Sequence, residues 1–410
     1  IARDMALAVP MNRLVQGDVG SGKTLPALYA MYIAANGGMQ SALMAPTELL
    51  ARQHALTAER LLAPLGISVG LLTGSLPASR RREALEGIRS GEWQLVVGTH
   101  ALLGKSVRFS KLGLAITDEQ HRFGVRQRRT LAELARGELA PHVLALSATP
   151  IPRSLALVLY GDLQVSVMDE SPPGRKAVKT RIVPESKREE LYRYLRERAL
   201  SGEQSFLVCP LVEEDEEGEA KSAKAMYAQL AEGPLKGVGL ALTYGTQPAA
   251  EREAALDAFY SGRAMVLVST TVIEVGMDVP NATTMVVEDA DRFGLAQLHQ
   301  LRGRVGRGEK ESWCFLLGEE NERLETLVQT SDGFVIAQKD LELRGPGEFL
   351  GTRQHGRMLD AYGIGDTRLL EETGRCLEEL QLGALGTDAY LEVLRQAEAR
   401  FGQPGNARLD

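Results

Sequence analysis

The chain has 410 residues, of which 44% are hydrophobic and 25% charged, the composition of an ordinary globular protein with two or three domains. No apolar run approaches the roughly 20 residues that a membrane-spanning helix needs, so we expect no such helix and no membrane partner. The net charge of −7 argues against indiscriminate nucleic-acid binding but leaves room for a local basic track.

The N-terminus carries no signal peptide or targeting pattern. It begins at Ile1, without an initiator methionine and shortly before the first predicted strand, so we expect that an N-terminal portion is missing. Cys209, Cys314 and Cys376 are odd in number, far apart and without metal-binding spacing. We interpret them as reduced, packed thiols of a cytoplasmic protein.

A complete phosphate-loop pattern lies near the start, where Gly17 is followed after four residues by Gly22, Lys23 and Thr24. Glycines let backbone N–H groups curl around phosphates, and the helix that follows directs its positive end at the same anion. Lys23 is expected to reach the β- and γ-phosphates of ATP, and Thr24 to hold Mg²⁺. The expected nucleotide-binding residues of the loop are Gly17, Asp18, Gly20, Ser21, Gly22, Lys23 and Thr24.

A predicted strand at Leu14–Val15 precedes this loop and a predicted helix, Ala27–Ala35, follows it. Strand, loop and helix in this order weigh against a glycine-rich turn that fits the pattern by chance. The next predicted strands are Ser41–Ala45, Ser68–Leu72, Leu95–Val97, Leu112–Ile116 and Val143–Leu146, and the helices are Glu48–Leu62 and Pro77–Arg89. This alternation predicts an α/β domain with a parallel sheet, whose ligands lie at the carboxyl ends of the strands.

The composition shifts at Ser171–Gly174, which we interpret as a linker, and the alternation then restarts. The predicted strands of this second α/β part are Arg181–Val183, Phe206–Val208, Val238–Leu242, Val266–Val268 and Thr284–Val287, and the helices are Glu185–Leu200, Ala223–Leu230 and Ala249–Phe259. The acidic run Glu213–Glu219 is expected to be a solvated loop. The predicted domains are residues 1–170, 171–318 and 319–410, the last one helical.

Two carboxylates, Asp118 and Glu119, follow the predicted strand Leu112–Ile116. At the end of a central strand Asp118 can hold Mg²⁺, and Glu119 can polarise an attacking water. The alternative is an exposed acidic turn. Ser147-Ala148-Thr149 ends the next predicted strand, where short hydroxyl side chains can sense the γ-phosphate, although this tripeptide also suits a helix cap.

In the second part, Gln300, Arg304 and Arg307 lie in a basic, glycine-containing segment. Arg304 and Arg307 are three residues apart and share a face if the segment is helical. Arginine stabilises the charge of a phosphoryl-transfer transition state, so we expect catalytic roles. The alternative is an exposed basic helix end. The segment with Thr271, Gly276 and Asp278 is expected to touch nucleotide and backbone phosphates.

The segments GDVGSGKT, APTELLARQH, GTHALL, TDEQHRFGVRQR, SATPIPR, TTVIEVGMDVP and QLHQLRGRVGRG together resemble the ordered motifs of a superfamily-two helicase motor. Essentially the whole chain resembles the RecG family of bacterial DNA helicases. DEQHRFGVRQR, the linker-spanning IPRSLALVLYGDLQVSVMDESPPGR and DGFVIAQKDLELRGPGEFLGTRQHG carry this closer resemblance, and the last looks like a translocation motif.

The resemblance implies two tandem RecA-like domains and a mainly helical C-terminal region with a helical hairpin around Gly345–Gln354. It implies an ATP- and Mg²⁺-dependent, monomeric, nucleoid-associated motor on double-stranded DNA that remodels stalled forks and Holliday junctions, with single-stranded DNA-binding protein as a candidate partner. Lys23, Asp118, Glu119, Gln300, Arg304 and Arg307 would be catalytic, and Arg344 and Arg353 would transmit domain closure. The fork-binding wedge and adenine-reading segment of the family precede the phosphate loop, so we expect this chain to be a motor without its fork reader.

Candidate DNA contacts are the residues at strand ends that face the cleft and the basic clusters. The predicted contact and coupling residues are Thr47, Thr99, His100, Arg126, Thr271, Arg344, Arg353 and Gln354. Arg80–Arg82 suits a phosphate contact and a solvated helix start equally well. A translocating motor contacts phosphates rather than bases, so salt-sensitive binding is expected.

Three other readings remain open. A transcription-repair coupling factor, which would push RNA polymerase, shares the FGVR and translocation segments, but DEQH and the SPPGR linker favour RecG. A non-hydrolysing DNA clamp is disfavoured by Glu119, Arg304 and Arg307. A small-molecule kinase would need an acceptor pocket and no second motor-like domain.

Overall fold

The structure, a computed structural model, describes residues 1–7, 9–119, 140–148, 163–170, 176–210, 216–270 and 279–344, with residues 372, 376, 392, 395 and 396. Residues 1–150 and 164–340 form one compact unit that contains two parallel sheets. The predicted linker Ser171–Gly174 and the predicted hairpin around Gly345–Gln354 lie outside the described residues. None of the described helices is both long and apolar enough to cross a membrane.

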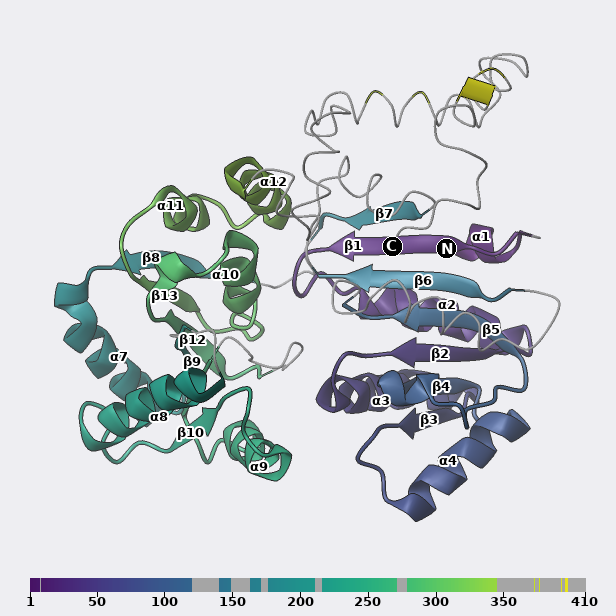
Figure 1. The fold of residues 1–410 in the computed structure, drawn as a ribbon, viewed down its shortest axis with the longest axis horizontal. Helices are drawn as coiled ribbons and strands as arrows, with labels where there is room; N and C mark the ends of the chain where they lie inside the picture. Colours follow the sequence, from purple (N-terminus) through teal and green to yellow (C-terminus); the bar gives the residue numbers. More distant parts are fainter. Residues whose placement is uncertain are drawn as a thin grey trace. The chain divides into compact units, whose positions relative to one another are not determined.

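The first sheet has seven strands in the order β3-β4-β2-β5-β6-β1-β7, and all neighbours are parallel (Figure 1). The strands are β1 Asn12–Gly17, β2 Gln40–Met44, β3 Val69–Leu72, β4 Leu95–Gly98, β5 Leu112–Thr117, β6 His142–Ser147 and β7 Gln164–Met168. The helices are α1 Ala2–Met5, α2 Thr24–Asn36, α3 Glu48–Leu62 and α4 Ala78–Ser90.

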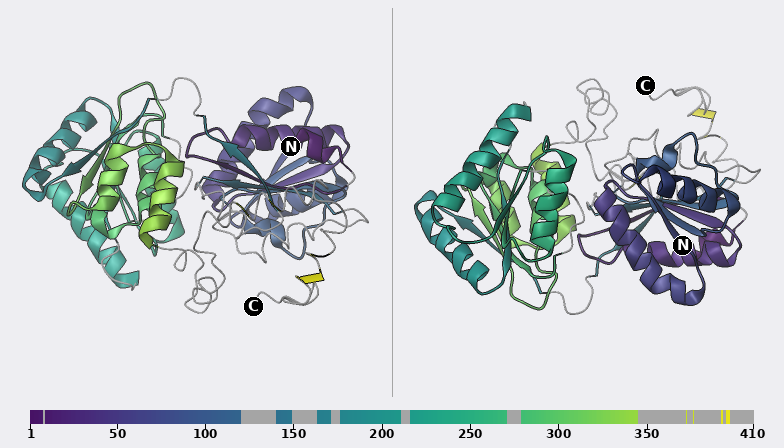
Figure 2. Two further views of the ribbon diagram at one scale, coloured as in Figure 1. Left: turned by 90° about the horizontal axis from the view of Figure 1, so that it is seen from above. Right: turned by 90° about the horizontal axis from the view of Figure 1, so that it is seen from below.

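This sheet is buried on both faces, because alternate residues of its central strands enter different cores. Leu43 of β2 packs in a core with α2 and α3, whereas its neighbours Ala42 and Met44 pack in a second core with α4. Helices lie on both faces of the sheet in Figure 2. Pro26 is the third residue of α2, within the first turn, where its missing N–H has no helical acceptor.

The second sheet has six strands in the order β10-β11-β9-β12-β13-β8, again all parallel. The strands are β8 Lys179–Val183, β9 Gln204–Val208, β10 Leu240–Thr243, β11 Val266–Ser269, β12 Ala282–Val287 and β13 Trp313–Leu317. The helices are α7 Arg188–Leu200, α8 Glu216–Glu232, α9 Ala249–Tyr260, α10 Leu295–Arg302, α11 Glu322–Gln329 and α12 Gly333–Arg344.

The second sheet is also covered on both faces. Phe206 and Val208 of β9 pack with α9, α10 and α11, while Leu207 between them packs with α7. The two parallel sheets and the central strands therefore confirm the predicted fold class for the described residues. Residues beyond α12 that would form the predicted hairpin lie outside this range.

Several sequence-based expectations need correction. The strands β7 and β13 were not predicted: β7 lacks a continuous apolar run, whereas β13 is apolar throughout and its local signal was overlooked. The acidic run is not a loop throughout, since Glu216–Glu219 lie in the first turns of α8. Cys209 and Cys314 are buried as expected, but Cys376 is exposed rather than packed.

Candidate ATP site and helicase motor

The predicted site residues follow neighbouring strands of the first sheet. In the order β4-β2-β5-β6-β1, the carboxyl ends lead to His100, Thr47, Asp118, Ala148 and the phosphate loop. Parallel strands end at the same edge of a sheet, so segments far apart in the sequence converge there. The convergence arises from strand order, which places β5 and β1 on either side of β6.

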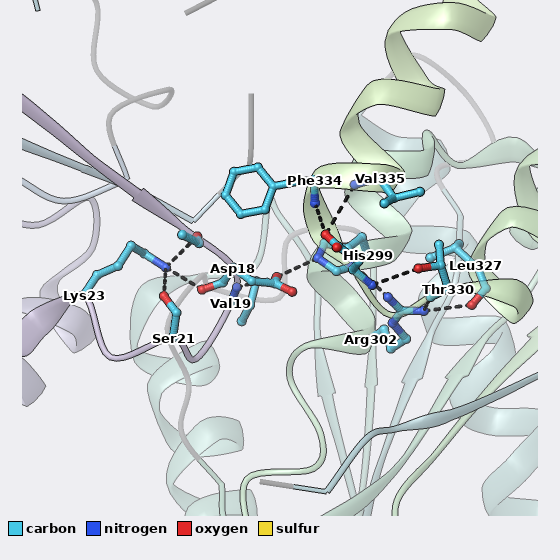
Figure 3. Close-up of polar contacts among 12 residues, drawn as sticks. Asp18, Val19, Ser21, Lys23, His299, Arg302, Leu327, Thr330, Phe334 and Val335 are labelled. Atoms are coloured by element: carbon cyan, nitrogen blue, oxygen red, sulfur yellow. Dashed lines mark hydrogen bonds and ion pairs between the residues drawn. The ribbon is translucent and has the colours of Figure 1, made fainter. Parts of the chain in front are cut away.

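The phosphate loop connects β1 to α2. Gly20 and Gly22 have φ values of 77° and 86°, the left-handed region that glycine adopts without strain. Lys23 Nζ donates to the carbonyl oxygens of Gly17 at 2.9 Å and Asp18 at 2.6 Å, and to Ser21 Oγ at 3.4 Å (Figure 3). Burial lowers the pKa of Lys23, while the charges of Glu119, Asp118 and Asp18 oppose this shift.

Asp118 is held by two neighbours. Its Oδ2 lies 2.7 Å from His54 Nε2, and its Oδ1 accepts a hydrogen bond of 3.0 Å from the Glu119 N–H. Burial alone would raise the pKa of Asp118, but the hydrogen bond and charge of His54, with the charge of Lys23, outweigh burial and lower it. Asp118 is therefore a carboxylate in a fixed orientation.

Glu119 differs from its neighbour in environment. The residue is 8% exposed and has φ of 54°, which a non-glycine residue adopts only under constraint. Burial, followed by the charge of Asp118, raises its pKa, whereas Lys23, Arg304 and a hydrogen bond from the Ala148 backbone oppose the rise. A buried carboxylate with a raised pKa is suited to accept a proton from water.

Arg304 and Arg307 follow α10, close enough for their charges to act on the groups of the phosphate-loop site. Arg304 is 5% exposed, and its charge acts on Glu119, while the charge of Arg307 contributes to lowering the pKa of Lys23. The condition under which both would share a helical face is not met, because α10 ends at Arg302 and Gly306 has φ of 76°. Gln300 lies on α10 and is half-buried.

Sequence reasoning did not single out His54, His299 or Arg302. His299 Nε2 lies 2.6 Å from Asp18 Oδ1, and Arg302 Nη2 lies 2.8 Å from His299 Nδ1 (Figure 3). All three side chains are buried polar groups within helices, a signal that a sequence contains only when the buried face of the helix is known. His54 and His299 do lie inside the quoted segments APTELLARQH and QLHQLRGRVGRG.

The residues predicted to contact DNA lie in different environments. Thr47 Oγ1 accepts a hydrogen bond from the Leu50 N–H and caps α3, and Thr99 is buried and accepts one from the Ala101 N–H. His100 is exposed. Arg126, Thr271, Gly276, Asp278, Arg353 and Gln354, together with Thr149 and the side chain of Arg344, lie outside the described residues.

The donor set fits a magnesium nucleotide. Thr24 is the first residue of α2, next to Lys23, and Asp118 supplies an ionised oxygen ligand two strands away. Mg²⁺ prefers hydroxyl, carboxylate and phosphate oxygens of this kind and keeps several waters. Among the described residues, no cluster of three or more His, Cys, Asp or Glu side chains offers a metal site made by protein alone.

Family models match most strands of each sheet. The model of the DEAD/DEAH box helicase matches residues 3–158, and that of the helicase conserved C-terminal domain matches residues 186–309. A solved structure of yeast Dbp5 bound to RNA and ADP BeF3 has 18% identity and a TM-score of 0.59, and covers 84% of this chain and 86% of that one. At this identity the likeness concerns the fold alone.

Closer relatives cover most of the chain. ATP-dependent DNA helicase RecG of Escherichia coli K12 is 51% identical over 364 residues, which are 87% of this chain and 52% of that protein. RecG of Thermotoga maritima is 46% identical over 403 residues, 96% of this chain and 51% of that protein. The structure of RecG bound to a three-way DNA junction has 43% identity and a TM-score of 0.72, and covers 88% of this chain and 48% of that one. The chain thus spans about half the length of the curated relatives it matches.

Two parallel-sheet domains with a phosphate loop, an acidic pair and converging arginines define the motor of a superfamily-two helicase. Within this class, the chain is 46% and 51% identical to two RecG helicases over 96% and 87% of its length. The chain belongs to the RecG family of DNA helicases.

Proposed function

We propose that this chain is an ATP hydrolase that couples ATP turnover to movement on double-stranded DNA and remodels branched DNA. The observation that carries the proposal is the contact between α10 and the phosphate loop, where His299 Nε2 lies 2.6 Å from Asp18 Oδ1 and Gly303 packs against Val19. This contact brings the segment that carries Arg304 and Arg307 to the edge of the first sheet where Lys23, Asp118 and Glu119 lie. This set supplies phosphate binding, water activation and transition-state charge.

In the proposed reaction, ATP binds at the phosphate loop with its γ-phosphate near Lys23. Glu119 orients a water and accepts its proton, and Asp118 and Thr24 would hold Mg²⁺, which neutralises phosphate charge when bound. Arg304 and Arg307 stabilise the charge that spreads over the transferring phosphoryl group. Gln300, Gly276 and Asp278 complete the proposed nucleotide contacts from the second domain.

The DNA side of the proposal rests on family membership and on the exposed His100. The relative of known structure is described as bound to a three-way DNA junction, and we extend branched DNA as a substrate to this chain. Thr47, Arg126, Thr271 and the segment with Arg344, Arg353 and Gln354 are the proposed contact and coupling residues. The buried Thr99 is more suited to holding its turn than to touching phosphate.

The wider context is proposed on the same basis. We infer a monomer in the bacterial cytoplasm near the nucleoid, with single-stranded DNA-binding protein as a candidate partner and with domains at residues 1–170, 171–318 and 319–410. The RecG relatives do not favour the alternative of a transcription-repair coupling factor.

The test is steady-state ATP hydrolysis by this chain without DNA, with linear duplex and with a forked junction. We expect turnover that both DNAs stimulate, and unwinding or regression of the fork in a gel assay. The matched control is Glu119→Gln, which should bind nucleotide without turnover. DNA binding without ATP turnover in any condition would instead support the non-hydrolysing clamp.

A further inference from the structure

Asp18, the second residue of the phosphate loop, contacts both Lys23 and His299 (Figure 3). Its carbonyl oxygen accepts from Lys23 Nζ at 2.6 Å. Its carboxylate Oδ1 accepts from the Val19 N–H at 2.6 Å and lies 2.6 Å from His299 Nε2 on α10. One residue thus joins the lysine that would bind phosphate to the helix that precedes Arg304 and Arg307.

The hydrogen-bond partners of His299 assign its tautomer. Arg302 Nη2 lies 2.8 Å from His299 Nδ1, and a guanidinium can only donate, so Nδ1 must carry a lone pair. The ring proton is therefore on Nε2 and is donated to Asp18 Oδ1. His299 is 5% exposed, so water competes little for either hydrogen bond.

Arg302 fixes the other side of the ring. Its Nη1 donates to the carbonyl oxygens of Leu327 at 2.8 Å and Thr330 at 2.9 Å, at the end of α11. Because Arg302 is itself 5% exposed and bonded at both terminal guanidinium nitrogens, the orientation of His299 is determined by the end of α11. A movement of Asp18 would consequently be transmitted to α10 rather than absorbed by rotation of the ring.

Lys23 supplies a reason for Asp18 to move. An ammonium group has three donors, and here all three face oxygens of the loop itself: Gly17 O, Asp18 O and Ser21 Oγ. Lys23 can bind a phosphate oxygen only by giving up at least one of these contacts. The shortest of them is to Asp18, whose carboxylate holds His299.

We propose that Asp18 and His299 form a latch that transmits the phosphate-bound state of Lys23 to the second sheet and positions Arg304 and Arg307 for hydrolysis. His299 is a positioning residue, since both of its ring nitrogens are engaged by protein groups, Nε2 by Asp18 and Nδ1 by Arg302. The inference rests on the proposed function, assigns a role to His299, and gives Asp18 a second role beside its expected contact with nucleotide.

The kinetic test compares His299→Phe, which keeps a ring without donors, with His299→Gln, which keeps a donor that can reach Asp18. Asp18→Ala and the Asp18→Ala/His299→Phe double variant complete a double-mutant cycle. We expect each single variant except His299→Gln to lower kcat about 10- to 100-fold, because misplaced arginines forfeit transition-state contacts. In His299→Phe, the dissociation constant of a fluorescent ADP analogue should change less than about twofold, because every residue of the phosphate loop remains.

The double variant should be no slower than the slower single variant. Effects that multiply, or a kcat of His299→Phe equal to wild type, would overturn the latch. Thermal melting identifies a variant that fails to fold, and Asp18→Ala, at a side chain 31% exposed, then remains as the test.

A second readout does not depend on turnover. Energy transfer is measured between dyes on Ser90→Cys and Glu189→Cys, both exposed, in a chain with Cys376→Ser. A non-hydrolysable ATP analogue should change the transfer in the wild type, and His299→Phe should lose at least half of that change. An unaltered response contradicts the latch. Absence of turnover in the wild type, with this response intact, would contradict the proposed function but not the latch.

Discussion

His54 Nε2 lies 2.7 Å from Asp118 Oδ2, so the helix that follows β2 holds the carboxylate that follows β5. His54 is 8% exposed, and its hydrogen bond and charge help to lower the pKa of Asp118 against the effect of burial. The residue proposed to hold Mg²⁺ is thereby kept ionised and oriented by a neighbour that binds no metal itself. Such outer partners commonly contribute to metal affinity.

Replacement of His54 should therefore weaken metal binding. For His54→Ala we expect the Mg²⁺ concentration for half-maximal ATP turnover to rise about 10- to 100-fold. Binding of Mn²⁺ in the presence of ADP, followed by electron paramagnetic resonance, should weaken in parallel. Arg52→Ala, an exposed neighbour on α3, is the matched control. An unchanged metal dependence would mean that Asp118 needs no orientation from His54.

Glu119→Gln tests the role of the second carboxylate. The amide cannot accept a proton from water, so kcat should fall by about 10²-fold or more while nucleotide still binds. Lys23→Ala is expected to nearly abolish turnover for another reason, loss of phosphate contact, and should also weaken nucleotide binding. Measurement of ATP turnover together with binding of a fluorescent nucleotide distinguishes the two variants, because only Lys23→Ala should weaken binding. Full activity of Glu119→Gln would mean that Glu119 does not activate the attacking water.

Gly303 permits close approach of α10 to the phosphate loop. A Cβ atom on Gly303 would lie 2.7 Å from the Val19 Cβ, closer than two carbon atoms can pack. We expect Gly303→Ala to lower kcat about 10-fold or more through misplacement of Arg304. The double variant with Val19→Gly should recover part of this loss relative to Val19→Gly alone. No loss in Gly303→Ala would show that the approach is not needed for turnover.

DNA binding should depend steeply on salt. Phosphate contacts release counterions, so the logarithm of the association constant should fall linearly with the logarithm of salt concentration. Fluorescence anisotropy with a labelled duplex measures the slope. The triple replacement of Arg80, Arg81 and Arg82 by alanine decides their role, because the slope decreases only if they contact phosphates. A binding constant that stays flat between low and high salt would contradict phosphate-driven affinity.

The second sheet contains a buried carboxyl that predicts a pH effect on stability. Glu288 is 2% exposed, accepts a 2.7 Å hydrogen bond from the Tyr192 hydroxyl, and is also bonded by Arg188. Burial raises the pKa of Glu288, although Tyr192 and Arg188 oppose the rise. The unfolded chain therefore loses this proton at lower pH than the folded protein does.

Stability of the wild type should consequently fall, relative to Glu288→Gln, as pH rises from the ordinary glutamate pKa through the raised one. Below that window both chains are neutral at this position and the difference is constant. Each unit of pKa shift corresponds to about 1.4 kcal/mol of unfolding free energy. Urea unfolding across pH measures the difference, and a wild type that gains stability over the variant in this window would contradict the assignment.

The sequence predicted strands correctly where a continuous apolar run marks them. The segments Leu112–Ile116 and Val266–Val268 are apolar throughout, because both faces of their sheets are covered, and they are β5 and β11. The strand β7 was missed because it is a partly exposed sheet edge without a continuous apolar run. The catalytic roles expected for Arg304 and Arg307 stay predictions, and the end of α10 at Arg302 could not be read from their spacing.

Taken alone, the sequence predicted the chemistry proposed for this protein, because a phosphate loop, an acidic pair and arginines are residue types whose function follows from spacing and charge. The tertiary structure decided which neighbouring side chains orient these residues. The pairing of His54 with Asp118 joins residues 64 positions apart, and that of His299 with Asp18 joins residues 281 apart. Such contacts depend on strand order and on the buried faces of helices, which local patterns do not specify.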